Sequence, residues 1–178
     1  SANGAGFKPI ADKIHSMGLK FGIHIMRGTP RQAGHRNTRI YGTTARARDI
    51  ASQFSLCPWN TDMYGVDTEK RGAEEYYDSL FKLYASWGVD FVKVDDIANT
   101  EFSPQNPYSA EKEIEMIRAA IDRSGRDMVL SLSPGPAPLN KAEHLSENAN
   151  MWRISDDFWD RWDKLLNMFS LCEKWYPY

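Results

Sequence analysis

The feature of this sequence that most constrains its fold is a repeated succession of helical and strand-like segments. Three stretches, 7–28, 72–96 and 109–135, each combine an amphipathic helical pattern, a glycine stop and a short apolar run that ends in polar residues. A shorter copy covers 141–157, and a last amphipathic segment covers 158–175. Since helices that alternate with short apolar strands are typical of crossover connections, the order predicts parallel βα units.

One interval breaks this rhythm. Residues 27–70 are polar and irregular, whereas a βα loop usually has about two to six residues. Long loops in compact domains often carry function. The stretch "SLCPWNTDMYGVD" within this interval has the composition of a binding loop.

Four strands are too few to close a barrel, and both ends of the sequence look cut. We therefore expect residues 1–178 to form the central portion of a single larger (β/α)8 (TIM-barrel) domain of the α/β class. A small doubly wound sheet is the alternative. No glycine-rich phosphate loop of the GxGxxG or GxxxxGK type follows any predicted strand, which disfavours it.

Composition excludes some classes of partner. The net charge of −2 gives no electrostatic reason to expect nucleic acid or an anionic membrane, and no apolar run is long enough to span a bilayer. Cys57 and Cys172 fit no zinc spacing and are expected to be free thiols, with a disulfide as the minor option. No signal peptide is visible; for a piece of a longer protein, a secreted or periplasmic location stays open, as does the oligomeric state.

Every predicted strand ends in polar side chains, at the edge where barrel enzymes carry their active sites. These residues are His24, Arg27, Lys93, Asp95, Asp96, Ser131, Ser133, Arg153, Asp156 and Asp157. An aspartate pair after a strand is also typical of a helix cap or turn. Two such pairs, each preceded on its own strand by a cation, favour a functional site.

Two carboxyl groups that face each other across a cleft are the catalytic groups that glycoside hydrolysis typically requires. One stays ionised, and the charge of Lys93 would favour this state for Asp95. The other must hold a proton, which burial and its partner's negative charge would favour for Asp157. Nearby aromatic residues would offer an apolar wall: Trp152, Phe158, Trp159 and Trp162.

Three motifs carry a resemblance to a known family. "HSMGLKFGIHI", "WGVDFVKVDD" and "WRISDD" resemble, in this order, glycoside hydrolase family 27, which contains α-galactosidases and α-N-acetylgalactosaminidases. The resemblance implies a barrel of which this chain supplies roughly strands 3 to 6. It also implies a retaining double displacement that removes terminal α-linked galactose without a metal or cofactor.

The resemblance places the nucleophile on Asp95 and the acid/base on Asp157, although the adjacent Asp156 leaves a one-residue shift open. It also puts the family's sugar contacts on the lysine and arginine of these motifs and on a loop cysteine. The full set of expected substrate-binding residues is Lys93, Arg153, His24, Cys57, Trp59, Asp96 and Ser133.

The sequence departs from the family pattern at several positions. His24 stands where the family has a tyrosine. Ile97 replaces a cysteine that many members bond to the loop cysteine, so Cys57 is expected to be a thiol. Ser133 points to N-acetylgalactosamine, but the surrounding "SLSPGPAPL" reshapes this loop, and the choice between the two sugars stays open.

Three further hypotheses remain. Lys93 could form a Schiff base with a carbonyl substrate, with Asp95 moving protons. The four aspartates of the two pairs could bind a hard cation. The chain could also be an inactive sugar-binding or structural fragment of a barrel, with unpaired sheet edges.

Overall fold

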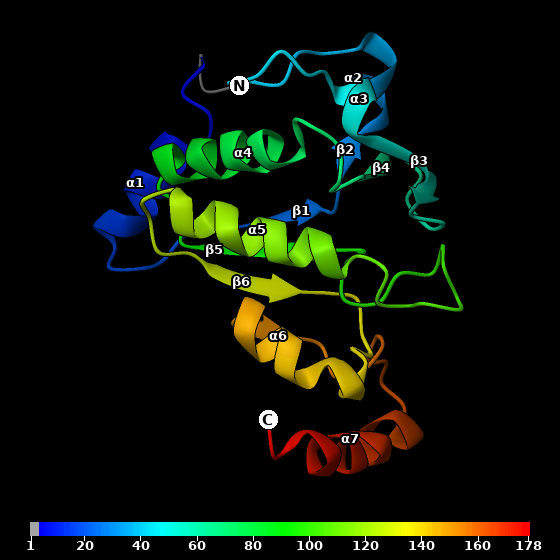
Figure 1. Ribbon diagram of the computed structural model, residues 1–178. Helices are drawn as coiled ribbons and strands as arrows, with labels where there is room; N and C mark the ends of the chain where they lie inside the picture. The colour runs from blue at the N-terminus through cyan, green and yellow to red at the C-terminus, as the bar shows by residue number, and fades with distance from the viewer. Residues whose placement is uncertain (1–3) are drawn as a thin grey trace.

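The computed structural model describes residues 4–178, and its centre is a parallel sheet of four strands (Figure 1). The strands are β1 (Gly22–Met26), β5 (Phe91–Asp95), β6 (Val129–Leu132) and β7 (Met151–Trp152). They lie in the spatial order β1-β5-β6-β7, which is also their order along the chain. The predicted parallel βα units are thus confirmed.

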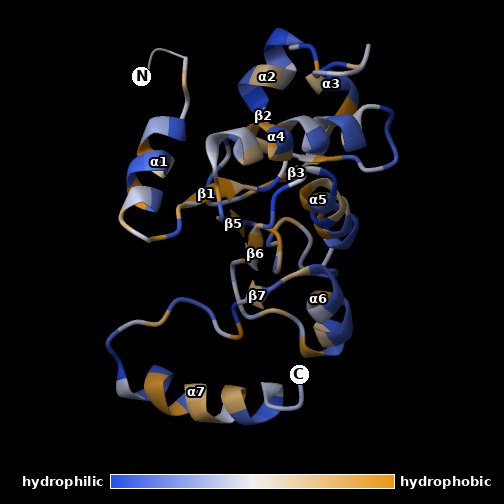
Figure 2. Ribbon diagram, turned by 90° about the vertical axis from the view of Figure 1, so that its left-hand side faces the viewer, coloured by the Kyte–Doolittle hydropathy of each residue, from blue (hydrophilic) through white to orange (hydrophobic). Residues whose placement is uncertain are grey.

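Helices alternate with these strands. They are α1 (Lys8–Ser16), α4 (Ala73–Trp87), α5 (Glu111–Arg123), the 3-10 turn η1 (Leu139–Lys141) with α6 (Ala142–Asn148), and α7 (Trp162–Trp175). Helices α5 and α6 lie on the same side of the strands (Figure 2). Because the strand order steps in one direction without reversal, the sheet is an arc of a (β/α)8 barrel and not a doubly wound sheet.

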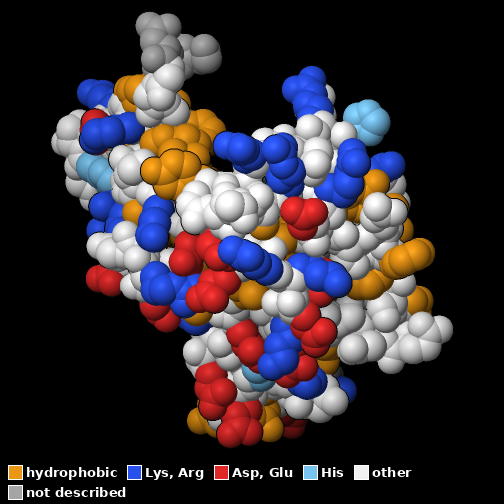
Figure 3. All heavy atoms as spheres, turned by 45° about the horizontal axis from the view of Figure 1, so that its top comes forward, with side chains coloured by type: hydrophobic (Ala, Val, Ile, Leu, Met, Phe, Trp, Pro, Cys, Tyr) orange, Lys and Arg blue, Asp and Glu red, His pale blue; other side chains and the backbone are white. Residues whose placement is uncertain are grey.

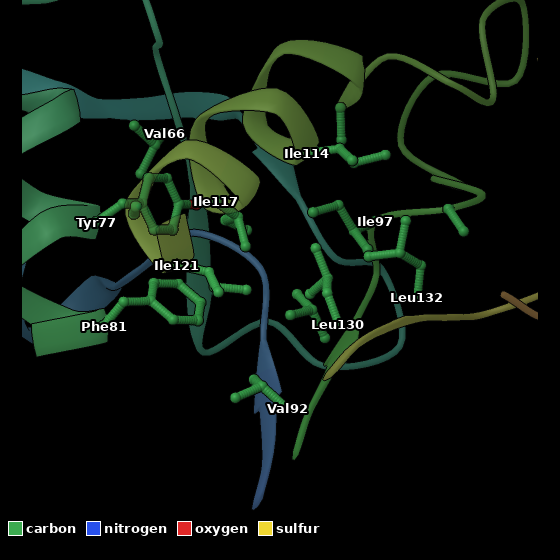
Figure 4. Close-up of a cluster of buried hydrophobic side chains, with 14 of the residues drawn as sticks. Val66, Tyr77, Phe81, Val92, Ile97, Ile114, Ile117, Ile121, Leu130 and Leu132 are labelled. Atoms are coloured by element: carbon green, nitrogen blue, oxygen red, sulfur yellow. The ribbon is translucent and has the colours of Figure 1, made fainter. Parts of the chain in front are cut away.

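The core lies between this sheet and its helices. Tyr77 and Phe81, one turn apart on α4, are fully buried, and α5 presents isoleucines at matching helical spacing. These side chains pack against the outward-facing residues of the strands (Figure 4). The labelled members of the cluster are Val66, Tyr77, Phe81, Val92, Ile97, Ile114, Ile117, Ile121, Leu130 and Leu132.

Strand register separates the apolar and polar faces of the sheet. Val92 and Leu130 are paired neighbours and face the helices. The next row along the strands pairs His24 with Lys93 and Lys93 with Ser131. Since side chains alternate along a strand, this polar row points to the opposite face, the interior of the barrel arc.

The interval 27–70 contains regular structure, so the prediction of an irregular loop is wrong. Its elements are β2 (Thr29–Pro30), α2 (Arg31–Arg36), α3 (Ala47–Ile50), β3 (Ala51–Leu56) and β4 (Met63–Val66). The strands form a separate antiparallel sheet in the order β2-β4-β3, with a register shift between Ser52 and Leu56. These elements are too short to produce a periodic sequence pattern. They are held by burial of Ile40, Ile50 and Val66 against the main core.

Charged side chains cover the outer helices without forming a field of one sign. Acidic and basic groups are interspersed over α4 and α5 (Figure 3). Arg123 of α5 pairs with Glu74 and Asp78 of α4 at 3.0 and 2.8 Å. Within residues 4–178, none of the helices combines the length and apolar character needed to cross a bilayer.

The amino end of β5 is anchored by one carboxylate. Asp90 accepts hydrogen bonds from the Phe21 backbone N–H at 2.8 Å and from Arg126 Nη2 at 2.6 Å, and His15 Nε2 lies 2.7 Å away. Burial opposes ionisation of this carboxyl, but these contacts outweigh it and lower its pKa from 3.8 to about 2. Asp90 thus joins the segment before β1, the start of β5 and the segment before β6.

We expect Asp90→Asn to destabilise the protein at neutral pH by about 2 kcal/mol, since each pKa unit corresponds to about 1.4 kcal/mol. Because the folded pKa lies below the unfolded one, this contribution is complete above pH 4 and disappears as pH falls towards 2. Urea unfolding at pH 7 and at about pH 2.5 should therefore show a large difference between variant and wild type only at the higher pH. The exposed Lys8–Asp12 pair provides the control: Asp12→Asn should cost less than about 1 kcal/mol at both pH values.

Candidate active site

The carboxyl ends of β5 and β7 open onto one hollow of about 460 Å³. Its lining includes both residues expected to be catalytic, Asp95 and Asp157. The complete lining is Trp59, Asp95, Asn99, Glu101, Pro134, Gly135, Pro136, Arg153, Asp156 and Asp157. Carboxylates from two strands that are not neighbours in the sheet therefore share one hollow, at the edge where barrel enzymes bind substrates.

Contacts to both carboxylate oxygens orient Asp95. Oδ1 accepts a hydrogen bond from Ser133 Oγ at 2.6 Å and one from the Asp96 backbone N–H at 3.1 Å. Oδ2 lies 3.3 Å from Nε2 of His24, and the Asp95 side chain is 15% exposed. Hydrogen bonds of this kind restrict the rotamers of a carboxylate side chain.

Asp157 has different surroundings. It accepts a hydrogen bond from Arg153 Nη1 at 2.8 Å, and its backbone N–H donates to Asp156 Oδ1 at 2.7 Å. Its side chain is 64% exposed, so the expected burial is not observed within residues 4–178. The reason is that β7 has only two residues and lies at the edge of the described sheet, where no further described strand covers Asp157.

Lys93 and Ser133 differ from their expected environments. Lys93 lies between His24 and Ser131 in the sheet, but makes no ion pair or side-chain hydrogen bond with other residues of the described chain. The basic side chain beside Asp95 is instead His24. Ser133 is completely buried, and its hydroxyl bonds to Asp95, so it positions the carboxylate without lining the hollow.

Asp96 and Cys57 are buried residues outside the lining of the hollow. The carboxylate of Asp96 is buried and pairs with Arg27 at 2.7 Å. Burial raises the pKa of the Cys57 thiol to about 11, and the negative charge of Asp96 adds to this effect. Cys57 and Cys172 are both free, as expected. Neither Asp96 nor Cys57 is part of the hollow's lining.

Sequence reasoning missed Asn99 and Glu101, which both line the hollow. They follow β5 within the same loop as Asp95, and Asn99 Nδ2 donates to the Pro136 carbonyl at 2.9 Å, which joins this loop to the one after β6. Their position shortly after a strand end is the signal that could have identified them.

The aromatic residues near Asp157 do not form a wall over the hollow. Trp152 packs against Trp175 with ring centroids 5.8 Å apart, and Trp159 and Trp162 are exposed. Phe158 lines a smaller adjoining hollow of about 160 Å³ together with Asp157. The aromatic side chain on the main hollow is Trp59, from the connection between β3 and β4.

The aspartates do not converge as metal ligands. Within residues 4–178, no group of three or more His, Cys, Asp and Glu side chains is placed to hold a metal ion. The geometry gives a reason, since Asp96 points into the protein whereas Asp95, Asp156 and Asp157 line the hollow.

Comparison with known proteins adds independent evidence. The family model described as α-galactosidase A matches residues 64–175. α-Galactosidase 3 of Hypocrea jecorina is 31% identical over 130 residues, which are 70% of this chain and 19% of the relative. This chain thus spans less than a third of that relative's length.

Two solved structures resemble the whole arc. A GH27 β-L-arabinopyranosidase from Geobacillus stearothermophilus is 66% identical, with a TM-score of 0.92 over 97% of this chain and 39% of that one. A putative α-N-acetylgalactosaminidase from Bacillus halodurans is 57% identical, with a TM-score of 0.80 over 99% of this chain and 39% of that one. With the same barrel arc and a match to the family model over most of its length, this chain belongs to glycoside hydrolase family 27, the family of α-galactosidase A.

Proposed function

We propose that the protein containing this chain is a retaining glycosidase with Asp95 as nucleophile and Asp157 as acid/base. One observation carries the proposal: both carboxylates line the same hollow, and Asp95 is held by contacts to each of its oxygens. Membership of a family whose named relatives are glycosidases supports it.

The chemistry follows from the two roles. Asp95 attacks the anomeric carbon and forms a glycosyl ester while Asp157 donates a proton to the departing oxygen. Asp157 then takes a proton from water, which attacks the ester and releases a sugar with its original anomeric configuration. Arg153 holds Asp157 on the side of the hollow towards β7. We expect the two carboxyl groups to lie about 5–5.5 Å apart in the complete active site, the separation typical of retaining enzymes.

We further propose terminal β-L-arabinopyranose as the preferred sugar. This pyranose shares the ring hydroxyl configuration of α-D-galactopyranose and lacks its hydroxymethyl group. Support comes from the β-L-arabinopyranosidase that is 66% identical to this chain. A variant of that enzyme, 65% identical to this chain, was solved in complex with arabinose. The α-galactoside remains the second candidate, on the support of the family match. Ser133 offers no support for N-acetylgalactosamine, because its buried hydroxyl is bonded to Asp95.

The first prediction concerns the sugar. We expect nitrophenyl β-L-arabinopyranoside to be hydrolysed with a kcat/KM at least about tenfold above that of nitrophenyl α-D-galactopyranoside, since one extra carbon in a fitted pocket typically costs about 10- to 200-fold. Steady-state kinetics of the full-length protein, with the 2-acetamido galactoside as a third substrate, measures this. A higher value for either galactose derivative would reverse the proposed preference.

The second prediction concerns the nucleophile. Asp95→Asn should lower kcat by at least about 1,000-fold without a loss of folding, because the amide keeps the shape but cannot attack. An activated 2-fluoro glycoside should label Asp95 in the wild type, as detected by peptide mass spectrometry. Asp127→Asn, an exposed aspartate before β6, is the control and should leave kcat unchanged. Normal turnover by Asp95→Asn would disprove the assignment.

The third prediction separates the adjacent aspartates. Asp157→Asn should lower kcat/KM for substrates with poor leaving groups by about 100-fold or more. It should leave kcat/KM for dinitrophenyl glycosides nearly unchanged, because their departure needs little proton donation, but lower their kcat, because hydrolysis of the glycosyl ester still needs the base. Asp156→Asn, a neighbour in the same hollow, should affect both substrate types equally. The opposite pattern would transfer the acid/base role to Asp156.

A further inference from the structure

We propose that Arg27 is a positioning residue for the nucleophile, because it fixes the backbone turn that carries Asp95 and Asp96. This inference rests on the proposed function, in which Asp95 attacks the sugar. Arg27 does not line the hollow. It follows directly after β1, which is the neighbour of β5 in the sheet. It would act entirely through the residues that it holds.

Three donors of Arg27 bind two consecutive residues. Its backbone N–H donates to the Asp95 carbonyl at 2.9 Å, and its Nε donates to the Asp96 carbonyl at 2.6 Å. Its Nη2 donates to the Asp96 carboxylate at 2.7 Å. The side chain of Arg27 is 1% exposed, so water does not compete for these hydrogen bonds.

The turn that Arg27 holds is conformationally unfavourable. Asp96 has φ +56°, in the left-handed region that residues with a side chain rarely adopt. This turn directs the Asp96 carboxylate into the protein and lets the Asp96 backbone N–H bond to Oδ1 of Asp95. A change of this φ would therefore withdraw one of the contacts that orient the nucleophilic carboxylate.

The guanidinium is itself fixed from its other side. Nη1 donates to Glu113 of α5 and to Ser55 of β3, both at 2.9 Å. Tyr77 of α4 donates to the second oxygen of Glu113 at 2.6 Å. Gly65 of β4 leaves room for this arrangement, since a β-carbon there would collide with the guanidinium. Arg27 thus joins the nucleophile turn to α4, α5 and the inserted sheet.

Arg27 also supplies the positive charge that Asp96 needs. Burial raises the pKa of Asp96, and Arg27 opposes this effect. The other oxygen of Asp96, Oδ1, has no hydrogen-bond partner within residues 4–178. Loss of Arg27 would leave this buried carboxyl group without compensation, and the turn would have to rearrange.

The opposite end of β5 offers a matched control. There Arg126 makes the same kinds of bond, from Nε to the Val89 carbonyl at 2.9 Å and from Nη2 to Asp90 at 2.6 Å. Arg126→Met therefore removes an arginine that also binds a carbonyl and a carboxylate on this strand segment, but away from the hollow. A purely structural role for Arg27 predicts equal kinetic effects of the two substitutions.

The experiment compares Arg27→Met and Arg126→Met in the full-length protein with the nitrophenyl glycoside that the wild type hydrolyses best. We expect Arg27→Met to lower kcat by about 100-fold, the scale of a misplacement of about 1 Å, for good and poor leaving groups alike and with KM within about threefold. Arg126→Met should keep kcat within about twofold when each protein is assayed well below its unfolding temperature. Equal effects on kcat, or wild-type kcat in Arg27→Met, would overturn the proposal.

Asp96 gives a second test if Arg27→Met does not fold. Asp96→Asn keeps an acceptor for Arg27 and tolerates the left-handed conformation, so kcat should stay within about threefold. Asp96→Ala removes the side-chain acceptor for Arg27 Nη2 and disfavours the left-handed conformation, so kcat should fall by at least about tenfold. If Asp96→Ala retains the kcat of Asp96→Asn, the turn does not position Asp95.

A crystal structure of the Arg27→Met or Asp96→Ala variant tests the positioning role without a measurement of turnover. We expect loss of the contact between Asp95 Oδ1 and Ser133 Oγ, which measures 2.6 Å in the native protein. If that contact and the left-handed φ of Asp96 both persist, the proposal is wrong. Absence of hydrolysis by the wild type on every nitrophenyl sugar would instead reject the proposed function, while the variant structure still decides the role of Arg27.

Discussion

The buried charge cluster around Arg27 is the constraint on which the arrangement of the site depends. One guanidinium there meets the carboxylates of Asp96 and Glu113, and all three side chains are at most 6% exposed. A buried charge destabilises the folded protein unless it has a partner of opposite charge. If one member of the cluster moved away, the others would be left buried without a partner, and the folded state would lose stability. Arg27 lies directly after β1, Asp96 lies directly after β5 and Glu113 lies on α5, with Ser55 from the inserted sheet. The insertion at 27–70 is therefore connected to the barrel arc through this cluster.

The two aspartate pairs look equivalent in the sequence but serve different purposes in the fold. In the first pair, the left-handed turn at Asp96 turns its carboxylate inward, whereas Asp95 lines the hollow. In the second pair, Asp156 and Asp157 both line the hollow, and Asp156 accepts a hydrogen bond from the backbone of its neighbour. The first pair is held by contacts to buried residues, which supports the nucleophile role proposed for Asp95. The second pair lies in the loop after β7, where Arg153 donates a hydrogen bond to Asp157.

The parts of the fold predicted correctly are those that local patterns encode. Isoleucines at helical spacing in α5, valines alternating with polar residues in β5, and Gly88 in a left-handed cap after α4 all act through neighbours in sequence. The inserted sheet was not predicted, because its strands are short and its stability comes from contacts with α4 and the core. Asn99 and Glu101 were not predicted for the same reason. Their place in the lining of the hollow depends on how their loop packs against the neighbouring loops.

The sequence by itself determined the βα order, the strand ends at which the polar residues gather, and the motifs that resemble glycoside hydrolase family 27. These features depend on residue spacing, which is fixed by the covalent chain. Only the tertiary structure decided that Ser133 bonds to Asp95, that Asp96 faces Arg27 and that Asp157 is exposed. The first two depend on side chains that lie 38 and 69 residues apart along the chain, and the third on which strands cover β7. No local pattern specifies such pairings, because they arise when separate segments pack together and each buried polar group must find its partner.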